Sequence, residues 1–166
     1  MVDAGIAFEI TSRQRGTTRT AGQQLIAAAN EQLTFTHPTT DWGHFSFSQI
    51  AGPLQQVNET TYAMRNTVVI EPGKLDRSPT GTGVSARMAL LHAKRTMSVG
   101  DKLRMQSVID SEFVGRIESE TMVGYHQAIV PLISGTAWRT GRFSFELDPT
   151  DPWPHGYRIS DTWGAD

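Results

Sequence analysis

The sequence contains no cysteine. Disulfides, thiolate nucleophiles and cysteine-ligated zinc are therefore excluded from these 166 residues. Secreted and cytosolic proteins can both lack cysteine, so the absence favours the cytoplasm only slightly. The cytoplasm is nevertheless the location we expect.

Long apolar runs and an excess of one charge are also missing. The longest unbroken apolar run covers residues 25–29 and is far too short to span a membrane. The N-terminal sequence MVDAGIAFEI has no basic residue ahead of its apolar ones, so we do not expect it to be a signal peptide. Fifteen basic and 17 acidic residues give a net charge of −2, which argues against nucleic acid or a membrane surface as partner. With 38% hydrophobic and 19% charged residues, the chain reads as one globular domain.

Hydrophobic periodicity predicts two helices. Residues 21–33 place Leu25, Ile26 and Leu33 on one face of a helix. Residues 84–95 are apolar around most of the helix circumference and should be largely buried. We expect the arginine-containing stretch 1–20 to be a solvated turn.

Alternation of apolar and polar residues predicts a mostly antiparallel sheet, and the chain as a whole reads as α+β. A hairpin turn is expected at Gly124, and the Pro- and Asp-rich stretch 148–156 should break the sheet. The predicted strands are 45–50, 61–70, 102–109, 112–119, 126–133, 135–147 and 158–163.

The strongest candidate site is Asp76-Arg77-Ser78-Pro79-Thr80-Gly81-Thr82-Gly83. Pro79 keeps Ser78 extended, so a helix begins only after it, and Thr80 or Thr82 can cap that helix. The glycines leave backbone N–H groups open to a carboxylate or phosphate at the positive helix end. The alternative is a Gly-rich loop that only caps a core helix, because the stretch matches neither the Walker A nor the dinucleotide fingerprint.

The histidines show no metal-ligand spacing, and we expect no metal. His37, in a His-Pro turn, should hold loop backbone, and His92, on the apolar helix, should be a satisfied core or boundary residue. The five are His37, His44, His92, His126 and His155.

The stretch DRSPTGTGVSARMALLHAK resembles the second active-site motif of the proline racemase family, DRSPCGTG followed by a Ser-Ala-Arg helix. The likeness extends in order over essentially the whole chain, but it covers only the second half of a family member; the first lobe, with its own catalytic motif, is absent. The stretches that match are VDAGIAFEI, NEQLTFTHP, RNTVVIEPGKLDRSP, FVGRIESET, SGTAWRTG and DPTDPWPHGYRISDTW.

The resemblance implies a diaminopimelate-epimerase-like lobe, in which a mostly antiparallel, barrel-like sheet surrounds a central helix, 82–95. Residues 1–20 would be an inter-lobe segment and residues 21–147 the second lobe. Residues 148–166 would be a C-terminal segment free to return to the missing first lobe. The tryptophans would pack in the core or between lobes; they are Trp42, Trp138, Trp153 and Trp163.

The family's racemases use one cysteine from each lobe on opposite faces of the substrate Cα, with no cofactor, and here Thr80 stands at the second position. A threonine hydroxyl does not ionise near neutral pH, so it cannot replace a thiolate base. Thr80 at this place resembles the trans-3-hydroxy-L-proline dehydratases, in which a first-lobe cysteine removes the proton and water is then lost. By the same resemblance Asp76 would hold the substrate ammonium, and the Gly81–Thr82 backbone its carboxylate.

Two alternatives remain open. The chain is half of a proline or hydroxyproline racemase or epimerase in which Thr80 is an unusual acid partner, or it is a non-catalytic half that binds a ligand or oligomerises. A third possibility for Thr80 alone is a plain helix cap. The partners expected are proline or hydroxyproline, the missing N-terminal lobe that carries the catalytic base and, where the half oligomerises, a second copy in a homodimer. We expect the isolated chain to be inactive.

Overall fold

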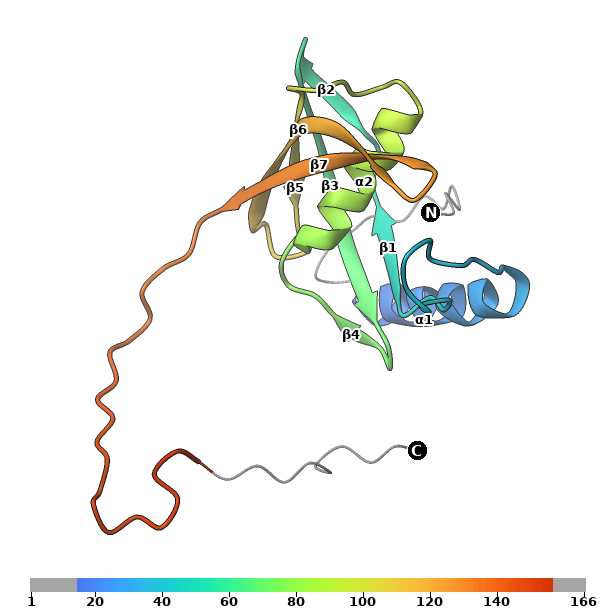
Figure 1. The fold of residues 1–166 in the computed structure, drawn as a ribbon. Coiled ribbons are helices and arrows are strands. Elements are labelled where there is room, and N and C mark those ends of the chain that lie inside the picture. Colours follow the sequence, from blue (N-terminus) through green and yellow to red (C-terminus); the bar gives the residue numbers. More distant parts are fainter. Residues whose placement is uncertain (1–14, 157–166) are drawn as a thin grey trace. The chain divides into compact units, whose positions relative to one another are not determined.

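A seven-stranded sheet and two helices make up the regular structure of residues 15–156, the part of the chain that this computed structural model describes (Figure 1). The predicted strand at 158–163 and most of the stretch 1–20 lie outside it. The helices are α1 (Arg15–Gln32) and α2 (Gly81–Ala93). The strands are β1 (Phe47–Ala51), β2 (Gln55–Asn58), β3 (Thr61–Ile70), β4 (Lys74–Leu75), β5 (Lys102–Gln106), β6 (Glu112–Val123) and β7 (His126–Gly135).

The sheet is mostly antiparallel, as predicted. Its main order is β1-β3-β5-β6-β7, and β2 and β4 also pair with β3. The one parallel pair among these is β3–β5, with Thr61 opposite Lys102, and parallel neighbours need a long crossover. The segment between β3 and β5 contains α2, so the crossover carries this helix back along the sheet. The β6–β7 hairpin turns at Gly124, which has a φ of 58°.

The second half of β3 is buried on both faces because each face is covered by a helix. Val68 contacts Gly83 of α2, and the next residue, Val69, packs against Gly22 of α1. Successive strand residues point to opposite faces, so the run Asn66–Thr67–Val68–Val69 has no solvent side. The strand end that precedes the candidate site is thus fixed from both sides.

Helix α2 supplies the centre of the apolar core, as its composition predicted. Val84, Met88 and Leu91 are buried on it. Each fully buried aliphatic side chain contributes about 1.5–3 kcal/mol. The core around these three is rich in methionine and comprises Tyr62, Met64, Val84, Met88, Leu91, Met97, Leu103, Met105 and Ile117.

Several sequence-based boundaries were wrong. Helix α1 begins at Arg15, so residues 15–20 are helical and do not form the predicted solvated turn. The short strands β2 and β4 were not predicted, because four and two residues give no measurable alternation. The predicted strand 135–147 does not form beyond Gly135, where β7 ends.

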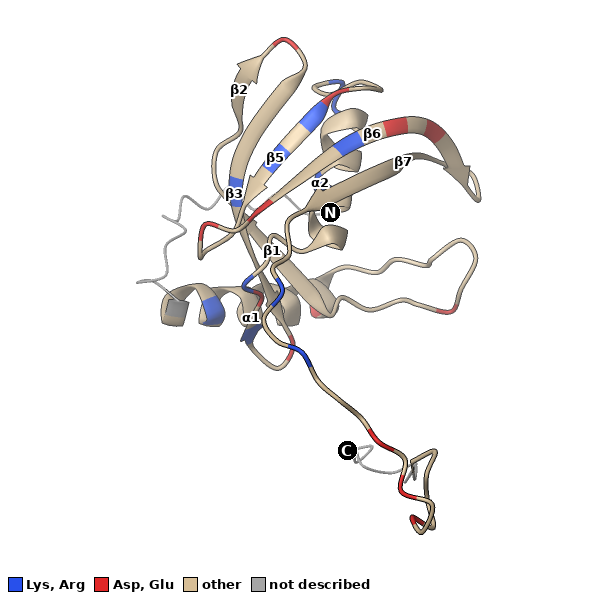
Figure 2. Cartoon of the chain, turned by 90° about the vertical axis from the view of Figure 1, so that its left-hand side faces the viewer, with Lys and Arg blue, Asp and Glu red and all other residues tan. Residues whose placement is uncertain are grey.

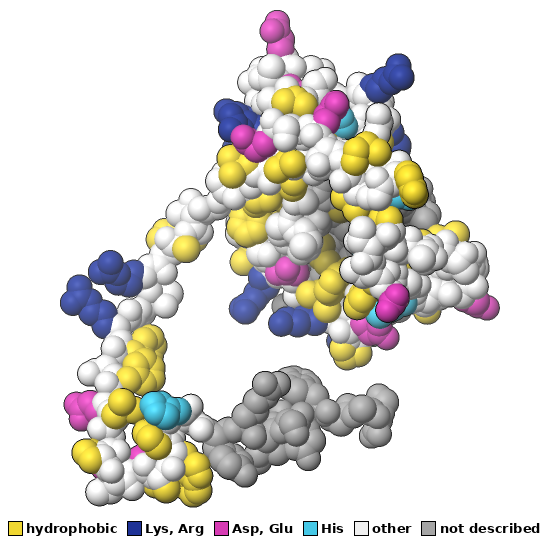
Figure 3. All heavy atoms as spheres, viewed as in Figure 1, with side chains coloured by type: hydrophobic (Ala, Val, Ile, Leu, Met, Phe, Trp, Pro, Cys, Tyr) yellow, Lys and Arg dark blue, Asp and Glu magenta, His cyan; other side chains and the backbone are white. Residues whose placement is uncertain are grey.

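Residues 137–156 form a unit of their own, and this described part has turns but no helix or strand. One turn is closed by Thr150, whose N–H and hydroxyl donate to the Asp148 carboxylate at 2.8 and 2.7 Å. Alternating Phe143, Phe145 and Leu147 find no strand partner and are exposed, as are the yellow side chains along this segment in Figure 3. A single strand cannot satisfy its own backbone, which explains the missing regular structure. Trp138 and Trp153 are exposed, so of the two expectations for them, packing in the core is wrong and packing between lobes stays a prediction.

Charges of both signs are interspersed over the ribbon without a continuous strip of either (Figure 2). Neither helix in the described range combines the length and hydropathy that crossing a bilayer requires.

Candidate functional site

The candidate site is the loop between β4 and α2, residues 76–80, called here the site loop, together with the first turn of α2. Strand pairing fixes one end of the loop, because the N–H of Asp76 donates to the Val68 carbonyl at 2.9 Å. The start of α2 fixes the other end, since the carbonyl of Thr80 accepts from the N–H of Val84 at 2.9 Å. Pro79 is fully buried between these anchors.

The carboxylate of Asp76 gathers the polar groups of the site loop. Its Oδ2 accepts the Thr80 hydroxyl at 2.5 Å, while its Oδ1 accepts the N–H of Ser78 at 2.9 Å and the Ser78 hydroxyl at 3.0 Å. Burial acts to raise the pKa of Asp76, but these hydrogen bonds and the nearby Lys74 outweigh it and leave the pKa below its ordinary value. Asp76 is therefore an anion at neutral pH, held in one orientation.

Thr80 stands at the N-cap position of α2 but does not cap it. Its backbone has φ 61° and ψ 108°, values that a β-branched residue rarely adopts, and its side chain makes no capping hydrogen bond. The predicted cap by Thr80 is thus wrong: the hydroxyl turns to Asp76 instead. Thr82, the other predicted cap, lies within the first turn of the helix.

The first turn of α2 consequently presents unused donors. Among the described residues, the N–H groups of Gly81, Thr82 and Gly83 have no hydrogen-bond acceptor. Open space lies beside the Cα of Gly81, and Thr82 is exposed. These groups carry the positive end of the helix dipole, an arrangement that attracts anions.

Two residues that the sequence reasoning missed hold the site loop by its carbonyl oxygens. Asn66, fully buried on β3, donates from Nδ2 to the Pro79 carbonyl at 2.8 Å. Ser111, just before β6, donates to the Arg77 carbonyl at 3.1 Å. Asn66 could have been found from the sequence, because it is polar whereas Met64 and Val68, its neighbours on the same face of the strand, are apolar. The sequence gives no such signal for Ser111.

The two histidines with sequence-based predictions have structural partners. His92 is about three-quarters buried and bridges the Met97 carbonyl at 2.9 Å and Glu120 at 3.1 Å, as expected of a boundary residue. His37 accepts the N–H of Thr39 at 3.3 Å and so holds its own loop. Residues 15–156 contain no cluster of three or more acidic or histidine side chains suited to a metal ion.

The site loop and the helix end together offer opposite charges a few residues apart. Anionic Asp76 suits an ammonium group, and the free N–H groups of Gly81 and Thr82 suit a carboxylate. The four residues singled out from the sequence thus meet at one end of α2, in an arrangement complementary to a small amino-acid zwitterion. The Thr80 hydroxyl lies between the two halves but cannot serve as a base near neutral pH.

Comparison with known proteins gives a consistent result. The family model described as Proline racemase matches residues 1–158. A crystal structure of a probable proline racemase from Agrobacterium radiobacter K84, with bound carbonate, is 33% identical, with a TM-score of 0.73, covering 98% of this chain and 47% of that one. A hydroxyproline epimerase from Agrobacterium vitis, with bound trans-4-hydroxy-L-proline, is 29% identical, with a TM-score of 0.71, covering 95% and 44%. The chain thus spans less than half the length of each of these two proteins.

Proposed function

The chain belongs to the proline racemase family, and from that premise we propose that it is the C-terminal half of a cofactor-independent trans-3-hydroxy-L-proline dehydratase. Its fold would be one lobe of the diaminopimelate-epimerase-like architecture, with α2 as the central helix. One observation carries the proposal: the hydroxyl of Thr80 donates to an ionised Asp76 at 2.5 Å. By the resemblance of the motif, Thr80 would stand where the family has its second catalytic cysteine.

This hydrogen bond argues against proton exchange on two faces of Cα. Racemisation needs a group on each face that both accepts and returns a proton, and the Thr80 hydroxyl does neither near neutral pH. Asp76 does not compensate, because its lowered pKa leaves it without a proton to give. Chemistry that needs only one base is what remains.

Dehydration is such a reaction. A base on the first lobe takes the Cα proton, and the electron pair of the broken C–H bond forms a Cα=C3 double bond. The C3–O bond breaks, and the departing hydroxide takes a proton from the protonated first-lobe base, which restores that base, and leaves as water. The cyclic enamine that results tautomerises to pyrroline-2-carboxylate.

The residues of this chain would orient the substrate. Asp76 would hold the secondary ammonium, and the N–H groups of Gly81 and Thr82 would hold the carboxylate, which also favours negative charge developing next to it. Because Thr80 donates its proton to Asp76, its oxygen has lone pairs left that can accept a hydrogen bond from the substrate.

The rest of the site would come from the missing N-terminal lobe. The coverage of 47% and 44% of the two solved relatives leaves room for such a lobe. Exposed aromatic side chains of 137–156, among them Trp138 at 77% and Phe145 at 92%, would pack against it, and residues 148–166 would return to it. Without that lobe we expect the 166-residue chain to be inactive.

A racemase or epimerase is the second candidate, because one solved relative is a hydroxyproline epimerase. It would require Thr80 to act as the acid on one face. The third, a non-catalytic half that binds a ligand or forms a homodimer, rests on the chain's length alone.

The test uses the chain joined to a first lobe that carries the catalytic cysteine, called here the completed enzyme. NMR should show trans-3-hydroxy-L-proline converted to pyrroline-2-carboxylate. Conversion of trans-4-hydroxy-L-proline to its Cα epimer, without elimination from the 3-hydroxy isomer, would replace the proposal by the epimerase.

A further inference from the structure

Thr80 is conspicuous because it does not do what threonine at an N-cap ordinarily does. With an extended backbone, the hydroxyl of an N-cap threonine accepts from the N–H of the second or third helical residue, here Thr82 or Gly83. Where it uses Thr82, that bond would occupy one of the two donors that a substrate carboxylate needs. The observed φ of 61° turns the hydroxyl onto Asp76 and leaves the donors free. Something must keep Thr80 in this rare conformation.

The first restraint is Asn66. Its side chain is fully buried, and its Nδ2 donates to the carbonyl of Pro79, the residue directly before Thr80. Its Oδ1 is buried with no partner, so the amide is committed to this single contact despite an unsatisfied acceptor. Burying this amide with an unsatisfied oxygen is unfavourable, and its one hydrogen bond goes to the site loop. We infer that Asn66 acts on the conformation of that loop.

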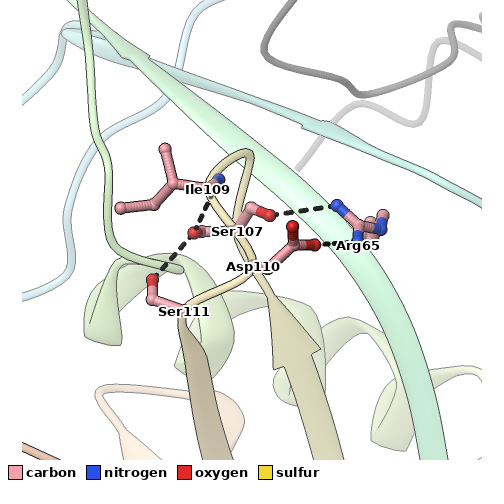
Figure 4. A network of polar contacts seen from close by, with 5 residues as sticks. All are labelled: Arg65, Ser107, Ile109, Asp110 and Ser111. Atoms are coloured by element: carbon pink, nitrogen blue, oxygen red, sulfur yellow. Dashed lines mark hydrogen bonds and ion pairs between the residues drawn. The ribbon is translucent and has the colours of Figure 1, made fainter.

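The second restraint is the β5–β6 turn, drawn in Figure 4. Arg65 of β3 pairs with Asp110 and donates to the Ser107 carbonyl at 3.3 Å, which ties the turn to the strand. The hydroxyls of Ser107 and Ser111 lie 2.7 Å apart. Ser111 uses its one proton on the Arg77 carbonyl at 3.1 Å, so Ser107 donates to Ser111. The chain of bonds therefore runs from β3 through the turn into the site loop.

We propose that Asn66 and Ser111 are positioning residues that hold the carbonyls of Pro79 and Arg77, so that Thr80 cannot cap α2 and the helix end stays open to a carboxylate. The proposal rests on the proposed function only in taking the carboxylate as part of the substrate. Without the two anchors, Thr80 relaxes to an ordinary N-cap and blocks the site from within the chain. Neither residue touches the substrate.

The test measures capping on the 166-residue chain and binding on the completed enzyme. Amide hydrogen exchange by NMR reports whether the N–H groups of Thr82 and Gly83 are capped, and calorimetric titration with pyrrole-2-carboxylate reports binding. Asn66→Ala should slow exchange at these two amides and weaken binding, each about tenfold, the effect of about one net hydrogen bond. Asn30→Ala is the matched control, because Asn30 also donates to a backbone carbonyl, that of Phe45 at 2.8 Å, away from the site loop.

A second background separates positioning from general destabilisation. In Thr80→Gly there is no hydroxyl to cap the helix, and glycine adopts positive φ freely. Adding Asn66→Ala to that background should leave both amide exchange and binding unchanged. An equal loss of binding in both backgrounds would overturn the proposal, as would unaltered exchange at Thr82 and Gly83 in the single variant.

Ser111→Ala keeps the test decisive if Asn66→Ala does not fold. It should shift exchange and binding in the same direction, by about threefold for its longer bond. Ser134→Ala, which removes a serine bond to the Val114 carbonyl at 3.2 Å, should shift neither. No change at either amide in Ser111→Ala would refute the positioning role. If the amides respond as described but the completed enzyme binds no pyrrole-2-carboxylate, the proposed function fails while the capping mechanism stands.

Discussion

Replacing Thr80 by valine removes the hydroxyl that donates to Asp76 at 2.5 Å and keeps the β-branched shape. A hydrogen bond to a charged group contributes about 1.5–3 kcal/mol, and partial solvent exposure of this pair reduces the figure to about 1 kcal/mol. The bond helps to hold the pKa of Asp76 below its ordinary value, so its loss raises that pKa. We expect Thr80→Val to lower the free energy of unfolding by about 1 kcal/mol at pH 7.

The pH dependence identifies the cause. A carboxylate whose pKa is lowered in the folded state adds stability above its unfolded pKa of about 3.9, and that stability is lost as the pH falls through the folded value. The difference between Thr80→Val and the unaltered chain should therefore be full at pH 7 and shrink as the pH falls below the unfolded pKa and through the folded pKa of Asp76.

Urea denaturation across this range, with the Asp76 carboxyl carbon followed by NMR, measures both quantities. Thr82→Val is the control, because Thr82 is exposed and donates to no carboxylate among the described residues. An equal loss at pH 7 and at a pH below the measured folded pKa of Asp76, or an unmoved Asp76 titration, would show that the hydroxyl does not stabilise the anion.

Three further predictions concern the site and the packing. Thr80→Cys in the completed enzyme should introduce inversion of L-proline, measured by chiral chromatography, or slow dehydration. If neither effect appears, Thr80 takes no part in the chemistry. Asp76→Asn should weaken pyrrole-2-carboxylate binding at least tenfold by calorimetry, consistent with loss of one charged hydrogen bond, whereas Asp148→Asn, at another carboxylate with a lowered pKa, should not. Gly22→Ala should destabilise the fold by about 2 kcal/mol in urea, because a methyl there overlaps Val69. Gly16→Ala, with open space beside it, should be neutral or stabilising, and a neutral Gly22→Ala would contradict the packing described.

Most of the long helices and strands could be predicted from the sequence, because a long element repeats its pattern of apolar or β-forming residues several times. The apolar circumference of residues 84–95 predicted a buried helix, and the β-forming residues of 61–70 predicted β3. The early start of α1 could not be predicted, since residues 15–20 have little apolar periodicity and the burial of Thr18 gives no signal in the sequence. The predicted strand 135–147 failed for the opposite reason: alternation is present, but a strand also needs a partner, which residues 137–156 do not contain.

The site was readable in part. The glycines after Pro79 predicted a helix end with free N–H groups, and the structure has them. The direction of the Thr80 side chain was not predictable, because residue preference alone makes threonine a cap. Asn66 and Ser111 hold the site loop in the conformation that directs the Thr80 hydroxyl to Asp76. Because both residues are far from Thr80 in the sequence, their contacts with the site loop could not be predicted.

The account depends on Thr80 being unable to exchange a proton at the substrate Cα. Incubating the completed enzyme with L-proline in deuterated water, followed by chiral separation and mass spectrometry, tests this most directly. We predict that no D-proline forms, while trans-3-hydroxy-L-proline is dehydrated under the same conditions. Accumulation of D-proline carrying deuterium at Cα would contradict the account.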